Sequence, residues 1–296
     1  MVSVFYSPQY VGSAHDFETT RKAKWVADSL TSHPMPAVEL VSPPSLSYEQ
    51  LLQVHAQAYV DAVRSGVPRD LAESQGFEWD AGLWPMVLAS NGGAVAAALA
   101  ALRSGVSGSL SSGLHHARRE QGAGYCTFNG LVLAAREALA AGAGSVLILD
   151  LDAHCGGGTA SLIAEEPRIW QLDISVCDFD SYESRERATL RMVRDAHEYL
   201  GEIERGLHDV QRRGRHFDLC LYNAGMDPYE GCDIGGLPGI TSEMLFAREQ
   251  LVFDWCRERE LAVAFVLAGG YTGDRLTEKG LVNLPRLTLS AATARN

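Results

Sequence analysis

Paired cysteines are missing from this sequence. No Cys-X-X-Cys motif occurs, and the six cysteines are scattered along the chain: Cys126, Cys155, Cys177, Cys220, Cys232 and Cys256. A disulfide framework and a cysteine-ligated zinc site both need cysteines at closer and more regular spacing, so neither is expected. We therefore expect reduced thiols and a cytoplasmic location.

Clusters of positive charge and long hydrophobic runs are also missing. The formal net charge is −12, which disfavours a nucleic-acid partner because phosphate contacts need grouped Lys and Arg, and favours cationic substrates. The most apolar segments, 92–102 and 131–143, are short and alanine-rich, so we expect no membrane span. The first residues lack the basic start and apolar core of a signal peptide.

What is present is the pattern of a folded α/β protein. Hydrophobic residues make up 46% and charged residues 21% of the chain, with no repeat, low-complexity tract or linker, so we expect one domain over 1–296. Hydrophobic periodicity predicts strands at 2–6, 37–41, 108–112, 146–150, 169–176, 218–224 and 262–269. It predicts helices at 19–30, 48–64, 84–103, 129–141, 159–165, 189–213 and 242–258. The alternation predicts three α/β/α layers around a mostly parallel sheet of about eight strands.

One stretch, residues 146–159, organises the prediction of a site. Its apolar strand ends in Asp150, Asp152 and His154 at alternate positions, followed by three glycines. Alternate residues of a strand share one face, so these side chains could converge. Buried carboxylates are costly unless they are paired or bind a metal, and a cation is the simplest explanation.

Three other predicted strands are followed by polar residues. His115 and His116 follow the strand predicted at 108–112, and Asp227 follows the strand at 218–224 in an Asn-Ala-Gly-Met-Asp-Pro segment. Tyr271 follows the strand at 262–269 and comes after two glycines. The carboxyl ends of parallel strands lie at one edge of the sheet, so these residues should line one pocket. Asp152, His154 and Asp227 are the candidate metal ligands.

Each of these residues also has a purely structural interpretation. Asp227 before a proline is an ordinary turn residue, and adjacent histidines such as His115 and His116 are often found by chance in loops. Tyr271 could be a core tyrosine. In the chemical interpretation the histidines are general-base and general-acid candidates, and the Tyr271 hydroxyl faces a polarised carbonyl oxygen.

Taken together, these motifs resemble the histone deacetylase family of the arginase-deacetylase fold. The resemblance rests on His-His before Gly-Tyr-Cys-Thr-Phe-Asn, and on Asp-Leu-Asp-Ala-His-Cys-Gly-Gly-Gly-Thr, Asn-Ala-Gly-Met-Asp-Pro and Ala-Gly-Gly-Tyr. It implies one zinc ion per chain on the three candidate ligands, with a catalytic histidine pair and an oxyanion-stabilising Tyr271. It also implies that Gly124 and Tyr125 line an acyl-lysine channel.

The resemblance further implies that Asp150 is hydrogen-bonded to His115 and that a structural potassium ion lies near Asp150, Asp152 and His154. Three departures from the family pattern stand out. Gly157 replaces the Asp or Asn that pairs with the second histidine, so we expect His116 to lack a carboxylate partner. The segment 177–187 is shorter than the channel-shaping loop of many members, and Asp173 falls where the potassium site often has a hydroxyl.

The leading hypothesis is therefore a metal-dependent amidohydrolase that deacylates an acyl-lysine peptide or a small acylated amine such as an acetylpolyamine. A ureohydrolase with two manganese ions is a second hypothesis, but it would need further acids where the chain has Gly156 and a solitary Asp227. A non-catalytic acyl-amine binding protein of the same fold is the third, and Gly157 is its only support. A homo-oligomer is compatible with the resemblance.

Overall fold

The computed structural model describes residues 1–13, 18–212 and 216–294. Its centre is an eight-stranded sheet in the order β2-β1-β3-β8-β7-β4-β5-β6, and each neighbouring pair is parallel. The strands are β1 Val2–Phe5, β2 Val38–Val41, β3 Val106–Ser109, β4 Val146–Asp150, β5 Ile169–Ser175, β6 Ala188–Met192, β7 Leu219–Gly225 and β8 Ala262–Ala268. The predicted parallel sheet of about eight strands is confirmed.

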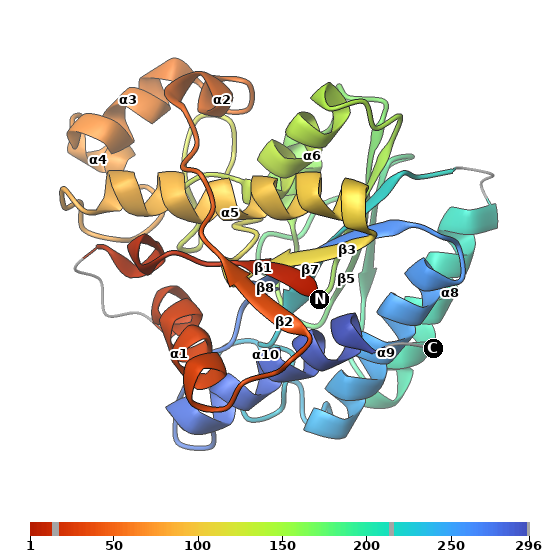
Figure 1. Cartoon of the computed structure of the whole chain (residues 1–296). Coiled ribbons are helices and arrows are strands. Elements are labelled where there is room, and N and C mark those ends of the chain that lie inside the picture. Colours follow the sequence, from red (N-terminus) through yellow and green to blue (C-terminus); the bar gives the residue numbers. More distant parts are fainter. Residues whose placement is uncertain (14–17, 213–215, 295–296) are drawn as a thin grey trace.

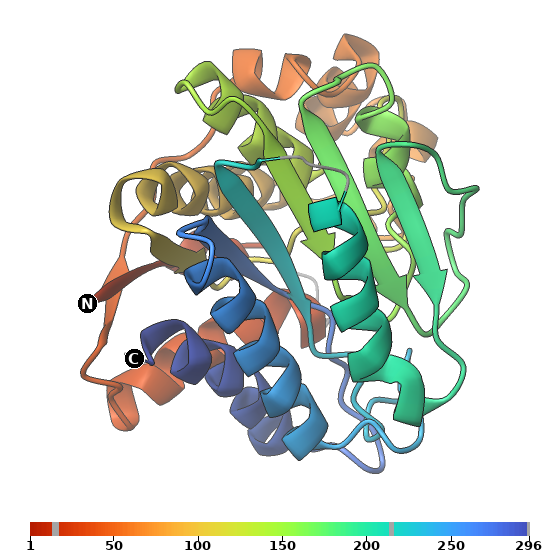
Figure 2. The same ribbon diagram turned by 90° about the vertical axis from the view of Figure 1, so that its right-hand side faces the viewer.

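Helices cover both faces of this sheet (Figure 1; Figure 2). One face carries α5 (Leu83–Ser104) and α6 (Gly130–Ala140), with the short helices α2 (Tyr48–Leu52), α3 (Gln57–Ser65) and α4 (Arg69–Ala72) beyond them. The other face carries α1 (Glu18–Ser32), α8 (Tyr199–Arg212), α9 (Ser242–Arg257) and α10 (Glu278–Thr293). The remaining elements are α7 (Gly157–Leu162) and the 3-10 turns η1 (Pro8–Val11) and η2 (Ala196–Glu198).

The strands contribute side chains to two separate hydrophobic cores, one on each face of the sheet. In β4, Leu147 and Leu149 pack into the core beneath α8 and α9, whereas Val146 and Ile148 pack into the core beneath α5 and α6. Side chains alternate across a strand, so a strand buried on both faces reads as a continuous apolar run. This is why the charged residues that follow Leu149 mark the end of the strand.

The predicted helix over 189–213 is wrong in its first part. Ala188–Met192 forms β6, which pairs with β5 at the edge of the sheet, and α8 begins only at Tyr199. Asp195 caps the turn between them, because its side chain accepts a hydrogen bond from the backbone N–H of His197. Leu190 and Val193 fit the spacing of a helical stripe by coincidence, and pairing with β5 decides their conformation.

Two further helix predictions need correction. The predicted helix over 48–64 is two helices, α2 and α3, because the chain turns at His55, whose Nδ1 donates to the carbonyl of Arg118. Helix α10 was not predicted at all, although Thr277 caps its first turn. All six cysteines are free, which agrees with the expected absence of disulfides.

Helix α5 is, within the described part of the chain, the one helix long and apolar enough to cross a membrane by length and composition. Its bounds agree within one residue with the predicted helix over 84–103. However, 67% of its apolar window is buried, and it packs on β3, β8 and α6. Burial between the sheet and its neighbours accounts for its composition.

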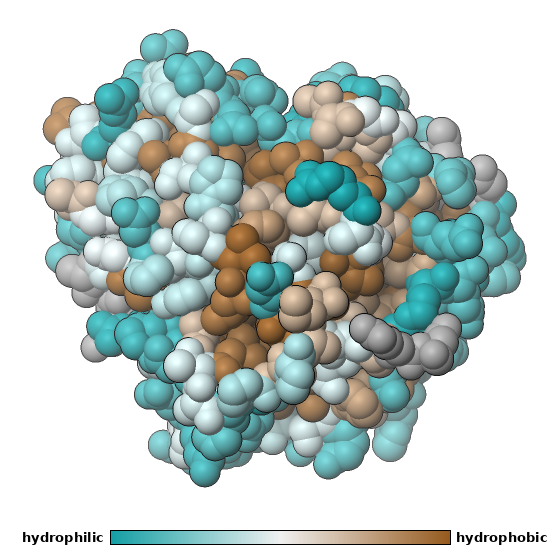
Figure 3. Space-filling view, viewed as in Figure 1, coloured by the Kyte–Doolittle hydropathy of each residue, from teal (hydrophilic) through white to brown (hydrophobic). Residues whose placement is uncertain are grey.

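The surface around the edge strand β2 is the most apolar area of the face shown in Figure 3. Leu40 of β2 is 38% exposed there. Polar side chains cover most of the periphery of the same face.

The carboxyl ends of β4 and β7 rest on a fully buried ion pair between Arg248 and Glu249 of α9. Nη1 of Arg248 donates to the carbonyl of Gly225 at 2.7 Å and to that of Leu151 at 3.3 Å. Each of these carbonyls lies one or two residues before a candidate metal ligand. A buried guanidinium thus connects the packing of α9 to the geometry of the site.

We predict that Arg248→Met destabilises the protein by about 3–5 kcal/mol, because it leaves the Glu249 carboxylate buried and uncompensated. Urea denaturation would measure the loss. The control is Arg257→Ala on the same helix, which removes a partly exposed pair with Asp254 and should cost about 1 kcal/mol or less. A loss for Arg248→Met no larger than that of the control would contradict the prediction.

Candidate active site

The residues predicted to form the site meet at the carboxyl edge of the sheet. Asp150 ends β4, and Asp152 and His154 follow it directly. Asp227 follows β7, Tyr271 follows β8, and His115 and His116 lie in the loop after β3. Since β8, β7 and β4 are neighbours in the sheet, their ends adjoin as open parallel sheets require.

Asp152, His154 and Asp227 form a compact, buried cluster. Nδ1 of His154 lies 3.2 Å from Oδ1 of Asp152 and 3.0 Å from Oδ2 of Asp227, and one ligand atom from each lies within 4.8 Å of the others. Backbone N–H groups orient both carboxylates: Ala153 donates to Asp227 and His154 donates to Asp152, each at 3.0 Å. The three residues present two oxygens and one nitrogen to a common point.

The charges of this cluster call for a cation. Burial raises the pKa of Asp227 to about 6, and the neighbouring Asp152 carboxylate adds to that rise. Burial would lower the pKa of His154, but hydrogen bonds and charges of both carboxylates raise it to about 11. Without a metal, the His154 imidazole is therefore protonated between the carboxylates of Asp152 and Asp227. A metal ion bound at this place would supply the positive charge instead of that proton. The donor set of two carboxylates and one imidazole fits a divalent transition metal with open positions.

The paired histidines differ in their electrostatics. Nδ1 of His115 donates to Oδ2 of Asp150 at 2.7 Å, as the resemblance implied. Burial would lower the pKa of His115, but Asp150 and Asp152 raise it to about 10. Burial and the adjacent His115 lower the pKa of His116 to about 4. With their Nε2 atoms 3.1 Å apart, one ring is protonated while the other is neutral.

His116 does have a carboxylate partner, contrary to the expectation drawn from Gly157. Nδ1 of His116 lies 3.0 Å from Oδ2 of Asp180, in the loop after β5. The Asp180 side chain is 8% exposed and also pairs with Arg118. The prediction was wrong because it considered only position 157 as the source of the carboxylate. The partner of His116 instead lies in the loop that follows β5.

Aromatic side chains form the mouth of the pocket. The predicted channel residue Tyr125 is 41% exposed, and its ring lies 5.2 Å from that of Phe77. The Phe179 ring, which is 50% exposed, packs edge-on against the His116 and His154 rings at 5.0 and 6.1 Å. Gly124 leaves room between these walls, because an added Cβ would come within 2.5 Å of the His116 ring and 2.9 Å of Phe179.

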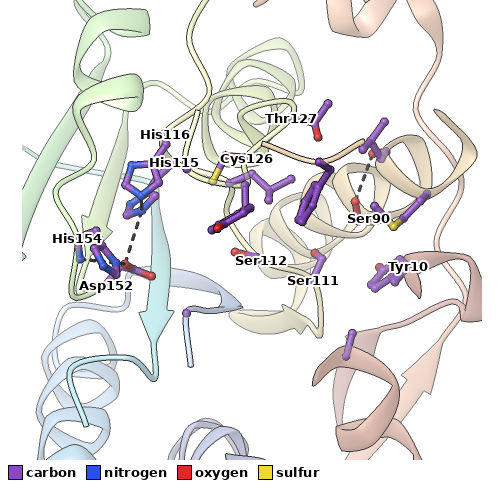
Figure 4. A pocket seen from close by; sticks show the side chains of 18 of the residues that line it. Tyr10, Ser90, Ser111, Ser112, His115, His116, Cys126, Thr127, Asp152 and His154 are labelled. Atoms are coloured by element: carbon purple, nitrogen blue, oxygen red, sulfur yellow. Dashed lines mark hydrogen bonds and ion pairs between the residues drawn. The ribbon is translucent and has the colours of Figure 1, made fainter. Parts of the chain in front are cut away.

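The same pocket is also lined by Ser112, Ser111 and Tyr10, which lie to one side of the two histidines in Figure 4. Asp152 and His154 lie at one end of the labelled residues, and Ser90 and Tyr10 at the other. Tyr271 lines the same pocket with its ring 6.4 Å from that of His154. Burial, followed by the charge of Asp227, raises the pKa of Tyr271, so its hydroxyl stays protonated and can donate a hydrogen bond.

A second group of buried oxygens lies behind Asp150. Asp173 and Ser175 come from β5, where the Ser175 hydroxyl donates to Asp173 and, at 3.2 Å, to the carbonyl of His154. Burial and the charge of Asp150 raise the pKa of Asp173 to about 8. Carboxylate, hydroxyl and carbonyl oxygens suit a hard cation, which fits the potassium ion that the resemblance implied. Ser175 is a hydroxyl that the sequence analysis did not single out.

Sequence reasoning missed three residues besides Ser175. Asp180 and Phe179 follow a predicted strand within a few residues, and this position could have suggested them. Lys22 of α1 gave no signal, because its partners are backbone atoms: Nζ donates to the carbonyls of Ala268 and Gly269, just before Tyr271. Burial lowers the pKa of Lys22 to about 8.

Comparisons with known proteins agree with this architecture. The structure superposes on an HDA15 HD domain with a TM-score of 0.81 at 17% identity, covering 99% of this chain and 91% of that one. It superposes on the acetylpolyamine aminohydrolase from Burkholderia pseudomallei with a TM-score of 0.79 at 16% identity, covering 99% of both chains. The parallel sheet and its helical layers are thus those of the arginase-deacetylase fold.

Sequence comparison identifies the family. Residues 15–282 match the histone deacetylase domain. Histone deacetylase 2 of Arabidopsis thaliana is 26% identical over 315 residues, which cover 96% of this chain and 79% of that protein. The chain belongs to the histone deacetylase family, whose members are hydrolytic enzymes that remove acetyl groups from amines.

We predict that Gly269→Ala weakens metal binding about 10- to 100-fold, the usual cost of disturbing a residue that orients a ligand. Gly269 has φ +47, and an added Cβ would meet Asp227 Oδ2 at 2.6 Å. Metal content after dialysis against a graded chelator would measure the effect.

Gly142→Ala is the matched control, because Gly142 has φ +106 but nothing within 4 Å of an added Cβ. It imposes the backbone strain without the clash, so its metal content should equal that of the wild type. Equal metal retention by the two variants would show that Gly269 does not constrain Asp227.

Proposed function

We propose that this protein hydrolyses an N-acyl amide, with acetyl as the leading acyl group, on a lysine-like or polyamine-like amine. A single zinc ion would be held by Asp152, His154 and Asp227. The observation that carries the proposal is the joint placement of this ligand cluster, the His115–His116 pair and Tyr271 around one pocket. Family membership supports the reaction class, and the geometry supports the assignment of roles.

The histidines divide the proton transfers in this proposal. A zinc ion at the cluster would polarise the amide carbonyl and acidify a water molecule. His116, whose pKa is lowered to about 4, is neutral at pH 7 and accepts the proton of the attacking water through Nε2. His115, whose pKa is raised to about 10, is protonated and supplies a positive charge and a proton for the departing amine.

Tyr271 serves as the oxyanion donor. Its phenol is kept protonated by burial, and it enters the pocket from the loop that Lys22 holds at Ala268 and Gly269. A hydrogen bond to oxygen strengthens as negative charge develops on that oxygen in the transition state. The loop carries Tyr271 and also packs Gly269 against Asp227, so the oxyanion donor and the metal ligand are positioned together.

The two alternative hypotheses lose support. A dinuclear manganese ureohydrolase needs a second cluster of ligands, and within 1–13, 18–212 and 216–294 the only group of three or more candidate ligands is Asp152, His154 and Asp227. The non-catalytic hypothesis rested on the missing partner of His116, and Asp180 occupies that place. Both hypotheses therefore have less support than hydrolysis of an N-acyl amide.

The mouth of the pocket favours a slender apolar linker beside the reacting amide. Tyr125, Phe77 and Phe179 provide aromatic faces, which pack well on the methylene chain of a lysine or polyamine. The net charge of −12 favours a cationic product amine. A potassium ion near Asp150, Asp152 and His154, beside Asp173 and Ser175, is a further part of the proposal. A cytoplasmic location and a homo-oligomer are the remaining parts.

A turnover panel tests the proposal directly. Acetyl-lysine peptides, acetylpolyamines and small N-acyl amines would be assayed for release of the free amine, with zinc and manganese measured in the same samples. We expect turnover with about one zinc per chain. Urea release from guanidino substrates with two manganese ions would overturn the proposal in favour of the ureohydrolase.

We predict that Tyr271→Phe removes about 2–4 kcal/mol of transition-state stabilisation, which lowers kcat roughly 30- to 900-fold, with KM almost unchanged. The reason is that the hydroxyl acts mainly on the developing oxyanion. Steady-state kinetics on the best substrate of the panel would measure it.

Tyr48→Phe is the control for loss of a tyrosine hydroxyl, because the Tyr48 hydroxyl donates to Asp61 at the surface and Tyr48 is not among the residues that line the pocket. It should leave kcat and KM at the wild-type values. An unchanged kcat in Tyr271→Phe would remove Tyr271 from the mechanism.

A further inference from the structure

The loop after β5 approaches His116 closely and is held there by several contacts. The backbone N–H of Cys155 donates to the carbonyl of Phe179 at 3.0 Å, and His154 and Cys177 form a parallel bridge. These bonds extend the pairing of β4 and β5 beyond the ends of both strands. They bring Asp180 beside the first turn of α7.

The Asp180 carboxylate is fully engaged. Oδ2 accepts from Nδ1 of His116 and from the backbone N–H of Gly158, each at 3.0 Å. Oδ1 accepts from Nη2 of Arg118. A carboxylate that accepts from a backbone N–H and an arginine has a fixed direction, so the imidazole that it contacts is fixed as well.

Asp180 lies in the space that a side chain at position 157 would need. An added Cβ on Gly157 would come within 2.3 Å of the Asp180 backbone carbonyl oxygen, 2.6 Å of its Oδ1 and 2.9 Å of its Cγ. Asp180 itself has φ +59, a conformation in which Asp is tolerated better than most residues. The glycine and the aspartate are therefore sterically linked, because any side chain at 157 would displace the carboxylate.

A purely structural role for Asp180 would be to cap α7 and to pair with Arg118. That role accounts for the bonds to Gly158 and Arg118, but it does not require contact with a buried imidazole in the pocket. The Nδ1 contact selects the tautomer of His116 with the proton on Nδ1, which leaves Nε2 as the basic nitrogen. This Nε2 atom lies 3.1 Å from Nε2 of His115, and both histidines line the pocket.

We propose that Asp180 is the residue that positions His116, and that the absence of a side chain at Gly157 leaves the space that the Asp180 carboxylate occupies. In this chain the carboxylate comes from the loop after β5 and not from the start of α7. Arg118 in turn fixes Asp180. The kinetic part of this inference rests on the proposed function, whereas the hydrogen bond itself can be tested without any substrate.

The neighbour of Asp180 gives the loop a second role. Phe179 packs against the rings of His116 and His154 at the pocket mouth, so one short loop carries a wall of the channel and the partner of the base. The two roles should separate kinetically. Phe179→Ala should raise KM, while changes at Asp180 should lower kcat.

The kinetic test compares Asp180→Asn and Asp180→Ala with Asp178→Asn. Both Asp180 variants should lower kcat with KM nearly constant, by between about tenfold and the roughly 10⁴-fold that a general base can contribute, and Asn should retain more activity than Ala. Asp178 lies two residues away, with its side chain 72% exposed and paired to Arg194, and its replacement should change nothing. Wild-type kcat in Asp180→Ala would overturn the proposal.

The spectroscopic test uses the imidazole N–H protons in the zinc-loaded protein and also in the metal-free protein. His115 and His116 should each give a strongly downfield Nδ1–H signal from a bond to a carboxylate. Asp180→Asn should shift or abolish the signal of His116 alone, and Gly157→Ala should do the same by displacing Asp180. The signal can be assigned with His116→Gln.

The two tests separate failure of the inference from failure of the proposed function. If the wild-type protein turns over no acyl amide, the proposed function fails, and the Nδ1–H signal still decides whether Asp180 positions His116. If the protein is active but both downfield signals persist in folded Asp180→Asn, the positioning role is overturned. Asp180→Asn is nearly isosteric, so it keeps the test valid if Asp180→Ala does not fold.

Discussion

The structure depends on the cost of burying negative charge at one edge of the sheet. Asp150, Asp152, Asp173 and Asp227 are at most 4% exposed, and the Asp180 side chain is 8% exposed. In a medium of low dielectric such a group is unstable unless positive charge and hydrogen-bond donors surround it. Three cationic or basic side chains contact these carboxylates directly: His115, His154 and Arg118. Two more, Lys22 and Arg248, donate to backbone carbonyls beside them. A metal ion at Asp152, His154 and Asp227 would supply the remaining positive charge.

The parallel topology explains why this charge is concentrated in one place. Every neighbouring strand pair runs in the same direction, so the ends of β4, β5, β7 and β8 deliver their loops to one edge. Both faces of β4 and β7 are buried, and their acidic residues therefore come only where the apolar cores end. The candidate metal ligands, the histidine pair and Tyr271 all lie in loops, and the sheet sets the distances between those loops.

Much of this arrangement could be predicted from the sequence, because the determining signals were local. The strand ending in Asp150, the pair His115 and His116, and the motif around Asp227 each combine an apolar run with polar residues at a known edge. The bond between His115 and Asp150 followed from the family resemblance. The strand β6 could not be predicted from its own residues, since Leu190 and Val193 fit a helical spacing and only pairing with β5 decides otherwise. Lys22 was missed for a similar reason, because its partners are backbone carbonyls that carry no sequence pattern.

The partner of His116 shows the limit of reading a motif position by position. What the imidazole requires is an oxygen about 3 Å from Nδ1, and this requirement concerns a point in space. Two segments border that point, the first turn of α7 and the loop after β5, and either one can supply a carboxylate if the other makes room. Gly157 makes room and Asp180 fills it. The apparent loss at Gly157 of a carboxylate partner for His116 is therefore a change in which segment provides that carboxylate. A missing residue in a motif indicates a degenerate site only when no neighbouring segment can reach the same point.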